Sequence, residues 1–123
     1  MFDYNLLISA IVFISIDSFY LNLMKKYFDK QIQNIQGTPI KMNFFAALIC
    51  YIFLITGLNY FIIKPKRSVR DAFLFGIIIY GVFETTNWTL FSQWSPLSVI
   101  IDTLWGGILF ALTTYIVNLF RKL

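Results

Sequence analysis

The sequence predicts an all-α fold: an integral membrane four-helix bundle with a short interfacial helix between the first and second spans. Of the 123 residues, 59% are hydrophobic and only 13% are charged, whereas soluble domains are about 25% charged. Four apolar segments each have roughly the 20 residues that a helix needs to cross the hydrocarbon layer. Helices satisfy their own backbone hydrogen bonds there. We expect one membrane domain, 1–123, with spans at about 5–23, 44–63, 72–91 and 97–120.

The first span and the connection after it are predicted from the positions of charged residues and helix-breaking residues. Segment 5–23 is interpreted as a retained helix and not a signal peptide, because Asp3 is the only early charge and no A-x-A site follows. In the connection 24–43, Phe28, Ile32 and Ile35 are spaced i, i+4, i+7 among Lys and Gln residues. This spacing predicts the short interfacial helix, which Gly37 is placed to end.

The other three spans follow in order. Cys50 lies in the middle of segment 44–63, where we expect a buried structural thiol; a lone Cys excludes a disulfide within the chain. The basic connection KPKRSVRD precedes segment 72–91, and the short uncharged SQWSP predicts an antiparallel hairpin with segment 97–120. Glycines in these last two spans are expected to let helices pack closely. They are Gly76, Gly81, Gly106 and Gly107.

The distribution of basic residues predicts orientation and partners. Six Lys and Arg residues lie on the side of the two termini and four on the other, a small excess that favours cytoplasmic termini. The net charge of +4 comes from residues at segment ends and in connections. Anionic lipid headgroups account for such charges, so membrane lipid is an expected partner and nucleic acid is not.

Three acidic residues lie inside the apolar segments, whereas none of the ten Lys and Arg residues does. They are Asp17, Glu84 and Asp102. Each costs roughly 2.5–3.5 kcal/mol at the centre of a membrane on insertion scales. Each is also only about five to seven residues, or ~8–10 Å of helix rise, from the face that carries the connections 24–43 and 92–96. The sequence therefore predicts one layer of carboxyl groups in that half of the bilayer.

Polar and aromatic neighbours extend this layer. Asn87 follows Glu84 at i+3 on the same helix face. Tyr20 follows Asp17 at i+3, and Trp105 follows Asp102 at the same spacing, so a phenol O–H and an indole N–H are available as donors. Trp94 is interpreted as an interfacial anchor. The predicted ligand- or ion-binding residues are Asp17, Glu84, Asp102, Asn87, Tyr20 and Trp105.

The same residues leave several functions open. The leading hypothesis is binding or conduction of a proton or small cation; conduction favours a homo-oligomer, because four helices hardly enclose a pore. An alternative is an enzyme or accessory protein of membrane lipid metabolism, with Glu84 or Asp102 as acid/base. Another is a structural subunit of a larger membrane complex. A non-enzymatic role is favoured, and neither cofactor nor metal is expected, because the chain has no His, no Cys pair and no phosphate loop.

Sequence motifs in the second half resemble a known family. They are Tyr-Gly-Val-Phe-Glu-Thr-Thr-Asn at 80–87, Thr-Leu at 89–90, Trp94 and Asp-Thr-Leu-Trp-Gly at 102–106. Together with Ile16-Asp17, they resemble the small predicted membrane proteins of domain of unknown function 2177. Glu84 stands where that family more often has Asp, and Tyr20 where it has Trp. The resemblance implies a four-helix membrane protein with no settled activity.

Overall fold

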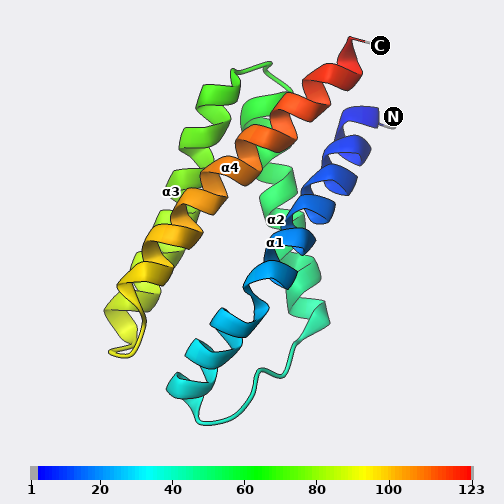
Figure 1. Ribbon diagram of the computed structural model, residues 1–123. Helices are drawn as coiled ribbons and strands as arrows, with labels where there is room; N and C mark the ends of the chain where they lie inside the picture. Colours follow the sequence, from blue (N-terminus) through cyan, green and yellow to red (C-terminus); the bar gives the residue numbers. More distant parts are fainter. Residues whose placement is uncertain (1–2, 123) are drawn as a thin grey trace.

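The computed structural model describes residues 3–122, and this part of the chain forms four long helices and no strand (Figure 1). They are α1 (Tyr4–Gln36), α2 (Phe44–Leu58) with its π-helical continuation η1 (Asn59–Ile63), α3 (Val69–Leu90) and α4 (Pro96–Arg121). All four, with α2 and η1 taken as one, are long and apolar enough to cross a membrane. The predicted fold class is confirmed.

Each helix begins at a polar side chain that caps its first turn. Asp3, Asn43, Ser68 and Ser95 have extended backbones, and their side chains accept hydrogen bonds from backbone N–H groups of α1, α2, α3 and α4. Gly37 ends α1 with φ of 77°, in the left-handed region that glycine adopts without strain. The local sequence thus sets the helix ends.

The connection 24–43 differs from the prediction, because its first part continues α1 and does not form a separate interfacial helix. No Gly or Pro occurs between Tyr4 and Gln36, so nothing stops the helix before Gly37. The 33 residues of α1 span about 50 Å, well beyond the ~30 Å hydrocarbon layer. Its last turns pack against the α3–α4 connection, where buried Gln31 accepts a hydrogen bond from the backbone N–H of Ser95 at 2.8 Å.

The helices pack in a chain of neighbours: α3 lies against α4, α4 against α1, and α1 against α2 (Figure 1). A Cβ atom at Gly76 would lie only 2.1 Å from the carbonyl oxygen of Gly106, so α3 and α4 are in backbone contact there. The buried core includes Phe13, Leu58 and Phe110 from three different helices. Both termini lie at the end of the molecule that also carries the α2–α3 connection.

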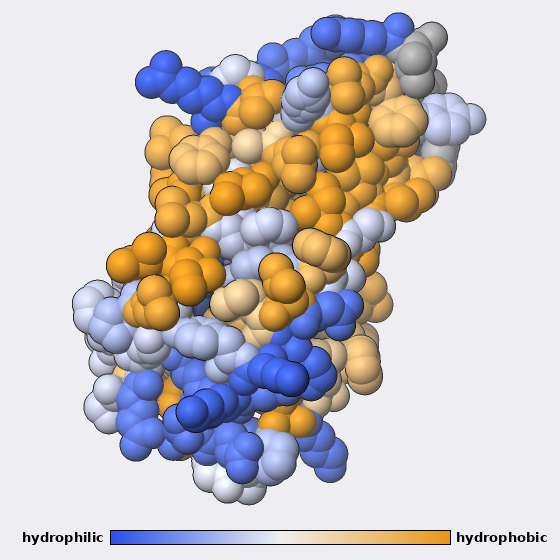
Figure 2. All heavy atoms as spheres, viewed as in Figure 1, coloured by the Kyte–Doolittle hydropathy of each residue, from blue (hydrophilic) through white to orange (hydrophobic). Residues whose placement is uncertain are grey.

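The outer surface is largely apolar, as a lipid-facing surface must be. Figure 2 shows a broad band of hydrophobic side chains with hydrophilic residues at both ends. Phe44, Phe53 and Leu74 are among the exposed hydrophobic side chains of the protein. Cys50 is also exposed, so the expectation of a buried thiol is wrong. Because α2 is apolar on every side, composition does not distinguish its lipid-facing side from its protein-facing side.

The glycine contact gives a first prediction. Gly76→Ala will lower the stability of the bundle by about 1–3 kcal/mol, because the new methyl group meets the backbone of α4, which cannot move aside locally. Gly81→Ala is the matched control, since its Cβ would meet only the methyl group of Thr103 at 3.5 Å, an ordinary contact. Loss of helical circular dichroism during titration with a denaturing detergent measures the difference. Equal stability of the two variants would contradict the backbone contact.

Candidate functional site

Two buried carboxyl groups face each other between α3 and α4. Glu84 is 1% exposed and Asp102 is 8% exposed, and their carboxyl groups lie within hydrogen-bonding range of each other. The indole N–H of Trp94 donates to Glu84 Oε1 at 2.9 Å. The hydroxyl group of Tyr20 donates to Asp102 Oδ1 at 3.0 Å. Each carboxyl group therefore has one aromatic donor and one carboxyl neighbour.

The short α3–α4 connection brings Trp94 to this pair. The backbone N–H of Trp94 donates to the carbonyl oxygen of Phe91 at 3.0 Å, and this hydrogen bond closes a tight turn. The indole then folds back over the end of the hairpin and is only 7% exposed. The interpretation of Trp94 as an interfacial anchor is therefore wrong: it is a buried hydrogen-bond donor. The tight turn, which the uncharged SQWSP sequence predicts, allows the indole of Trp94 to fold back toward Glu84.

Asp17 of α1 lies apart from the Glu84–Asp102 pair and faces α2 and α4. Trp105 Nε1 donates to its Oδ1 atom at 2.9 Å, and the hydroxyl group of Tyr51 donates to its Oδ2 atom at 2.6 Å. Both oxygens thus have a donor, although the side chain is 6% exposed. A carboxylate that is desolvated in this way is stabilised by charge-assisted hydrogen bonds.

The two acidic positions are joined by an aromatic stack. The rings of Tyr20 and Trp105 are parallel within 2°, with centroids 4.3 Å apart. Each ring donates to the acid of the opposite helix: Tyr20 of α1 binds Asp102 of α4, and Trp105 of α4 binds Asp17 of α1. The Asp-x-x-aromatic spacing in both helices therefore supports a reciprocal exchange between helices, and not a contact within one helix.

The structure brings together five of the six site residues predicted from the sequence. Asn87 is the exception: it is half-buried, and no hydrogen bond of its side chain is present within residues 3–122. Sequence reasoning missed two donors, Tyr51 and Trp94. Tyr51 lies about seven residues, or ~10 Å, into α2, the same depth as the acids, and this depth was the signal that could have identified it.

The charged surroundings of the three acids are sparse. The ion pairs in the described part of the chain, Lys25–Asp29 and Arg67–Asp71, both lie on the surface. Within residues 3–122, no three His, Cys, Asp or Glu side chains are grouped as a metal site requires. The donors to the acids are therefore aromatic side chains and, for the Glu84–Asp102 pair, the neighbouring carboxyl group.

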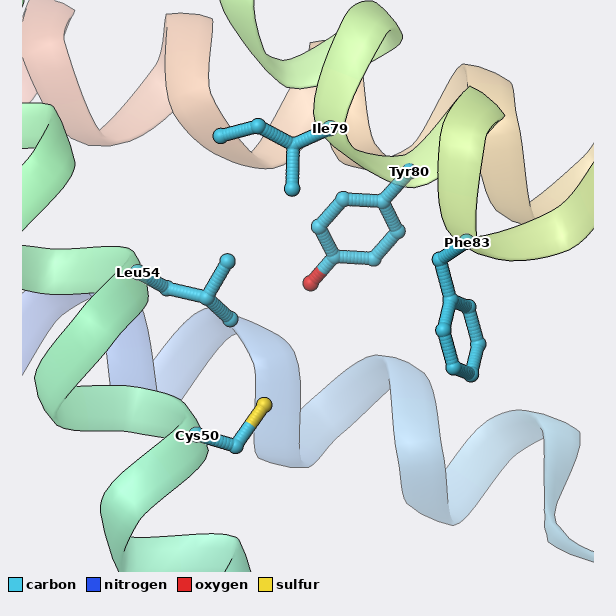
Figure 3. A pocket seen from close by; sticks show the side chains of 5 residues that line it. All are labelled: Cys50, Leu54, Ile79, Tyr80 and Phe83. Atoms are coloured by element: carbon cyan, nitrogen blue, oxygen red, sulfur yellow. The ribbon is translucent and has the colours of Figure 1, made fainter. Parts of the chain in front are cut away.

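An apolar pocket opens between α2 and α3 beside this network. Its volume is about 230 Å³, and the residues that line it are Cys50, Leu54, Ile79, Tyr80 and Phe83. In Figure 3 the hydroxyl group of Tyr80 points from α3 toward the α2 side of the pocket. Tyr80 also lies within electrostatic range of Asp17 and Asp102. The pocket thus places an apolar lining around the Tyr80 side chain.

Comparison with known proteins gives a family but no close structural relative. The family model described as "Predicted membrane protein (DUF2177)" matches residues 4–119, nearly the whole chain. No curated protein and no solved structure matches the chain.

The donors at Asp17 give a second prediction. Tyr51→Phe will reduce stability by about 1.5–3 kcal/mol, the usual range for a hydrogen bond to a charged group. Tyr60→Phe, at a 65% exposed position of η1, makes the same chemical change and should alter stability by less than about 0.5 kcal/mol. Detergent-induced unfolding of both variants, repeated in an Asp17→Asn background, measures the coupling. If Tyr51→Phe costs no more than Tyr60→Phe, the hydrogen bond does not support the fold.

Proposed function

The chain belongs to the DUF2177 family of predicted membrane proteins, and we propose that it binds a proton within the membrane at the Glu84–Asp102 pair. One observation carries the proposal: two buried carboxyl groups lie within hydrogen-bonding range of each other. No ion pair reaches either of them from the described residues. The family description assigns no activity, so the proposal rests on this geometry.

A proton is what this pair needs chemically. Ionised carboxylates only accept hydrogen bonds, so a hydrogen bond between two carboxyl groups requires a proton on one of them. Two unit charges 4 Å apart repel by about 4 kcal/mol at an effective dielectric constant of 20. Trp94 and Tyr20 each supply one further donor, which suits a pair that carries one proton and one negative charge.

The position of the pair gives the proton a short route. Glu84 is about six residues, or ~9 Å, from the end of α3, and Asp102 is equally far from the start of α4. The indole of Trp94 covers Glu84 on the side of the α3–α4 connection. A proton therefore enters from that end, past or around Trp94.

The surroundings favour binding over conduction within one chain. One turn from Asp17, α1 buries Phe13, which is 0% exposed and packs edge-on against Tyr51 and Phe110. This apolar layer separates the acids from the opposite end of the bundle. A proton is also favoured over a cation such as Ca²⁺, which takes six or more oxygen ligands.

The apolar pocket favours a second candidate, an enzyme or accessory protein of membrane lipid metabolism. A lipid chain between α2 and α3 would lie beside Tyr80. In that case Glu84 or Asp102 would exchange a proton with the lipid. Lipid mass spectrometry after deletion of the gene tests this candidate, and an unchanged lipid profile would remove it.

Infrared spectroscopy tests the proton-binding proposal directly. The wild-type protein in lipid vesicles should show a protonated carboxyl C=O band that persists at neutral pH. The band should be lost in Glu84→Gln and in Asp102→Asn, because an amide can occupy the same hydrogen bonds without a titrating proton. Asp71→Asn, at a surface ion pair, is the control and should leave the band unchanged.

Two outcomes would overturn the proposal. One is the absence of a protonated carboxyl band in the folded wild-type protein. The other is a band that survives in both pair variants. Proton flux into proteoliposomes, measured on the same samples, separates binding from conduction: we expect no flux above that of empty vesicles for the single chain. Flux that Glu84→Gln abolishes would show that the bound proton also crosses the membrane.

A further inference from the structure

A second polar site lies at the other end of the bundle, where the termini meet the α2–α3 connection (Figure 1). It is a cleft of about 360 Å³, and Figure 2 shows hydrophilic side chains gathered at this end. Lys64 directly follows η1 and so lies at the end of the span Phe44–Ile63, at the depth of lipid headgroups. The residues that line the cleft are Asp3, Asn5, Asn59, Ile63, Lys64, Lys66 and Arg121.

The cleft has an excess of positive charge. Lys64 and Lys66 are exposed and make no ion pair within residues 3–122. Arg121 is held in place, since its guanidinium group donates to the carbonyl oxygen of Ile63 and to Asn118 Oδ1. The one acidic side chain, Asp3, accepts a hydrogen bond from the backbone N–H of Asn5 at 3.0 Å. Three cations against one carboxylate favour an anionic ligand.

Asn59, one of the residues that line the cleft, has a buried acceptor without a donor. Asn59 is 9% exposed, and its Nδ2 atom donates to Ser9 Oγ and to the carbonyl oxygen of Ile55, both at 2.8 Å. Its Oδ1 atom has no hydrogen-bond partner among the described residues. Asn59 also begins the π-helical turn η1, a type of irregularity that is frequent at functional sites. Buried acceptors of this kind are uncommon in folded proteins.

We propose that this cleft binds the headgroup of an anionic phospholipid that carries hydroxyl groups, of which phosphatidylglycerol is the simplest. The phosphate offers only acceptors, and these match Lys64, Lys66 and Arg121. A glycerol hydroxyl group supplies the donor that Asn59 Oδ1 lacks, once the enclosed amide turns toward the cleft. A choline headgroup is excluded because it has no donor and no net charge. The acyl chains extend along the apolar outer surface next to the cleft, where Phe61 is exposed.

Native mass spectrometry of the whole protein in detergent, with added dioleoylphosphatidylglycerol, tests this site. Lys64→Ala/Lys66→Ala should weaken phosphatidylglycerol binding about tenfold or more, because each basic residue near a headgroup contributes severalfold in affinity. Lys26→Ala/Lys30→Ala removes the same charge at the opposite end of the molecule and should leave binding unchanged. Asn59→Leu should reduce the preference for phosphatidylglycerol over phosphatidylcholine. If Asn59→Leu does not fold, the lysine variants decide.

Further ligands distinguish a phospholipid headgroup from a soluble phosphate ester. Glycerol phosphate without acyl chains should not displace the lipid, and phosphatidylethanolamine should bind more weakly than phosphatidylglycerol. Four outcomes would overturn the proposal: equal retention of phosphatidylcholine, equal loss in the two double-lysine variants, displacement by glycerol phosphate, or stronger binding of phosphatidylethanolamine. Glu84→Gln should bind phosphatidylglycerol like wild type, so this site and the proton site are tested independently.

Discussion

A carboxyl group inside a hydrocarbon layer must carry a proton or be surrounded by donors, and this requirement organises the bundle. Each of the three buried acids receives its donors from a different element: Asp17 from α2 and α4, Asp102 from α1, and Glu84 from the α3–α4 connection. Lipid provides little hydrophobic drive for one helix to associate with another. These hydrogen bonds therefore specify which helix faces lie inward. They join α1 to α2 and α4, and they join α3 to the α3–α4 connection.

The acid pair depends in turn on how closely α3 and α4 approach. Gly76 and Gly106 bring the two backbones into contact, and Glu84 and Asp102 lie on the part of the hairpin between that contact and the connection. A side chain at the glycine contact would spread the hairpin and separate the carboxyl groups. At the connection end of the hairpin, the last turns of α1 hold the start of α4. Gln31 and Tyr27 form hydrogen bonds with Ser95 and Ser98 there.

The sequence was sufficient for four helices of membrane-spanning length and for the family, because apolar composition, length and motif spacing are local properties. It was not sufficient for the hydrogen-bond partners of the three acids. The exchange of Tyr20 and Trp105 between helices depends on how α1 and α4 are rotated about their axes. Rotation is poorly encoded when lipid-facing and protein-facing residues are equally apolar, which also explains the exposed position of Cys50. The roles of Trp94 and Tyr51 required the path of a turn and the approach of α2, neither of which follows from residue spacing.

The apolar layer around Phe13 divides the molecule into two polar regions with different chemistry. On one side, acids are matched to aromatic donors without a basic residue; on the other, Lys64, Lys66 and Arg121 surround an amide with an unused acceptor. In α1 the buried polar side chains Ser9 and Asp17 lie eight residues, or ~12 Å, apart, with Phe13 midway between them. A lipid headgroup at the basic end would therefore lie on the Asn59 side of Phe13 and would not reach Asp17. Any coupling between the two sites would have to act through the packing of Phe13 and Phe110, since the described hydrogen bonds do not connect them.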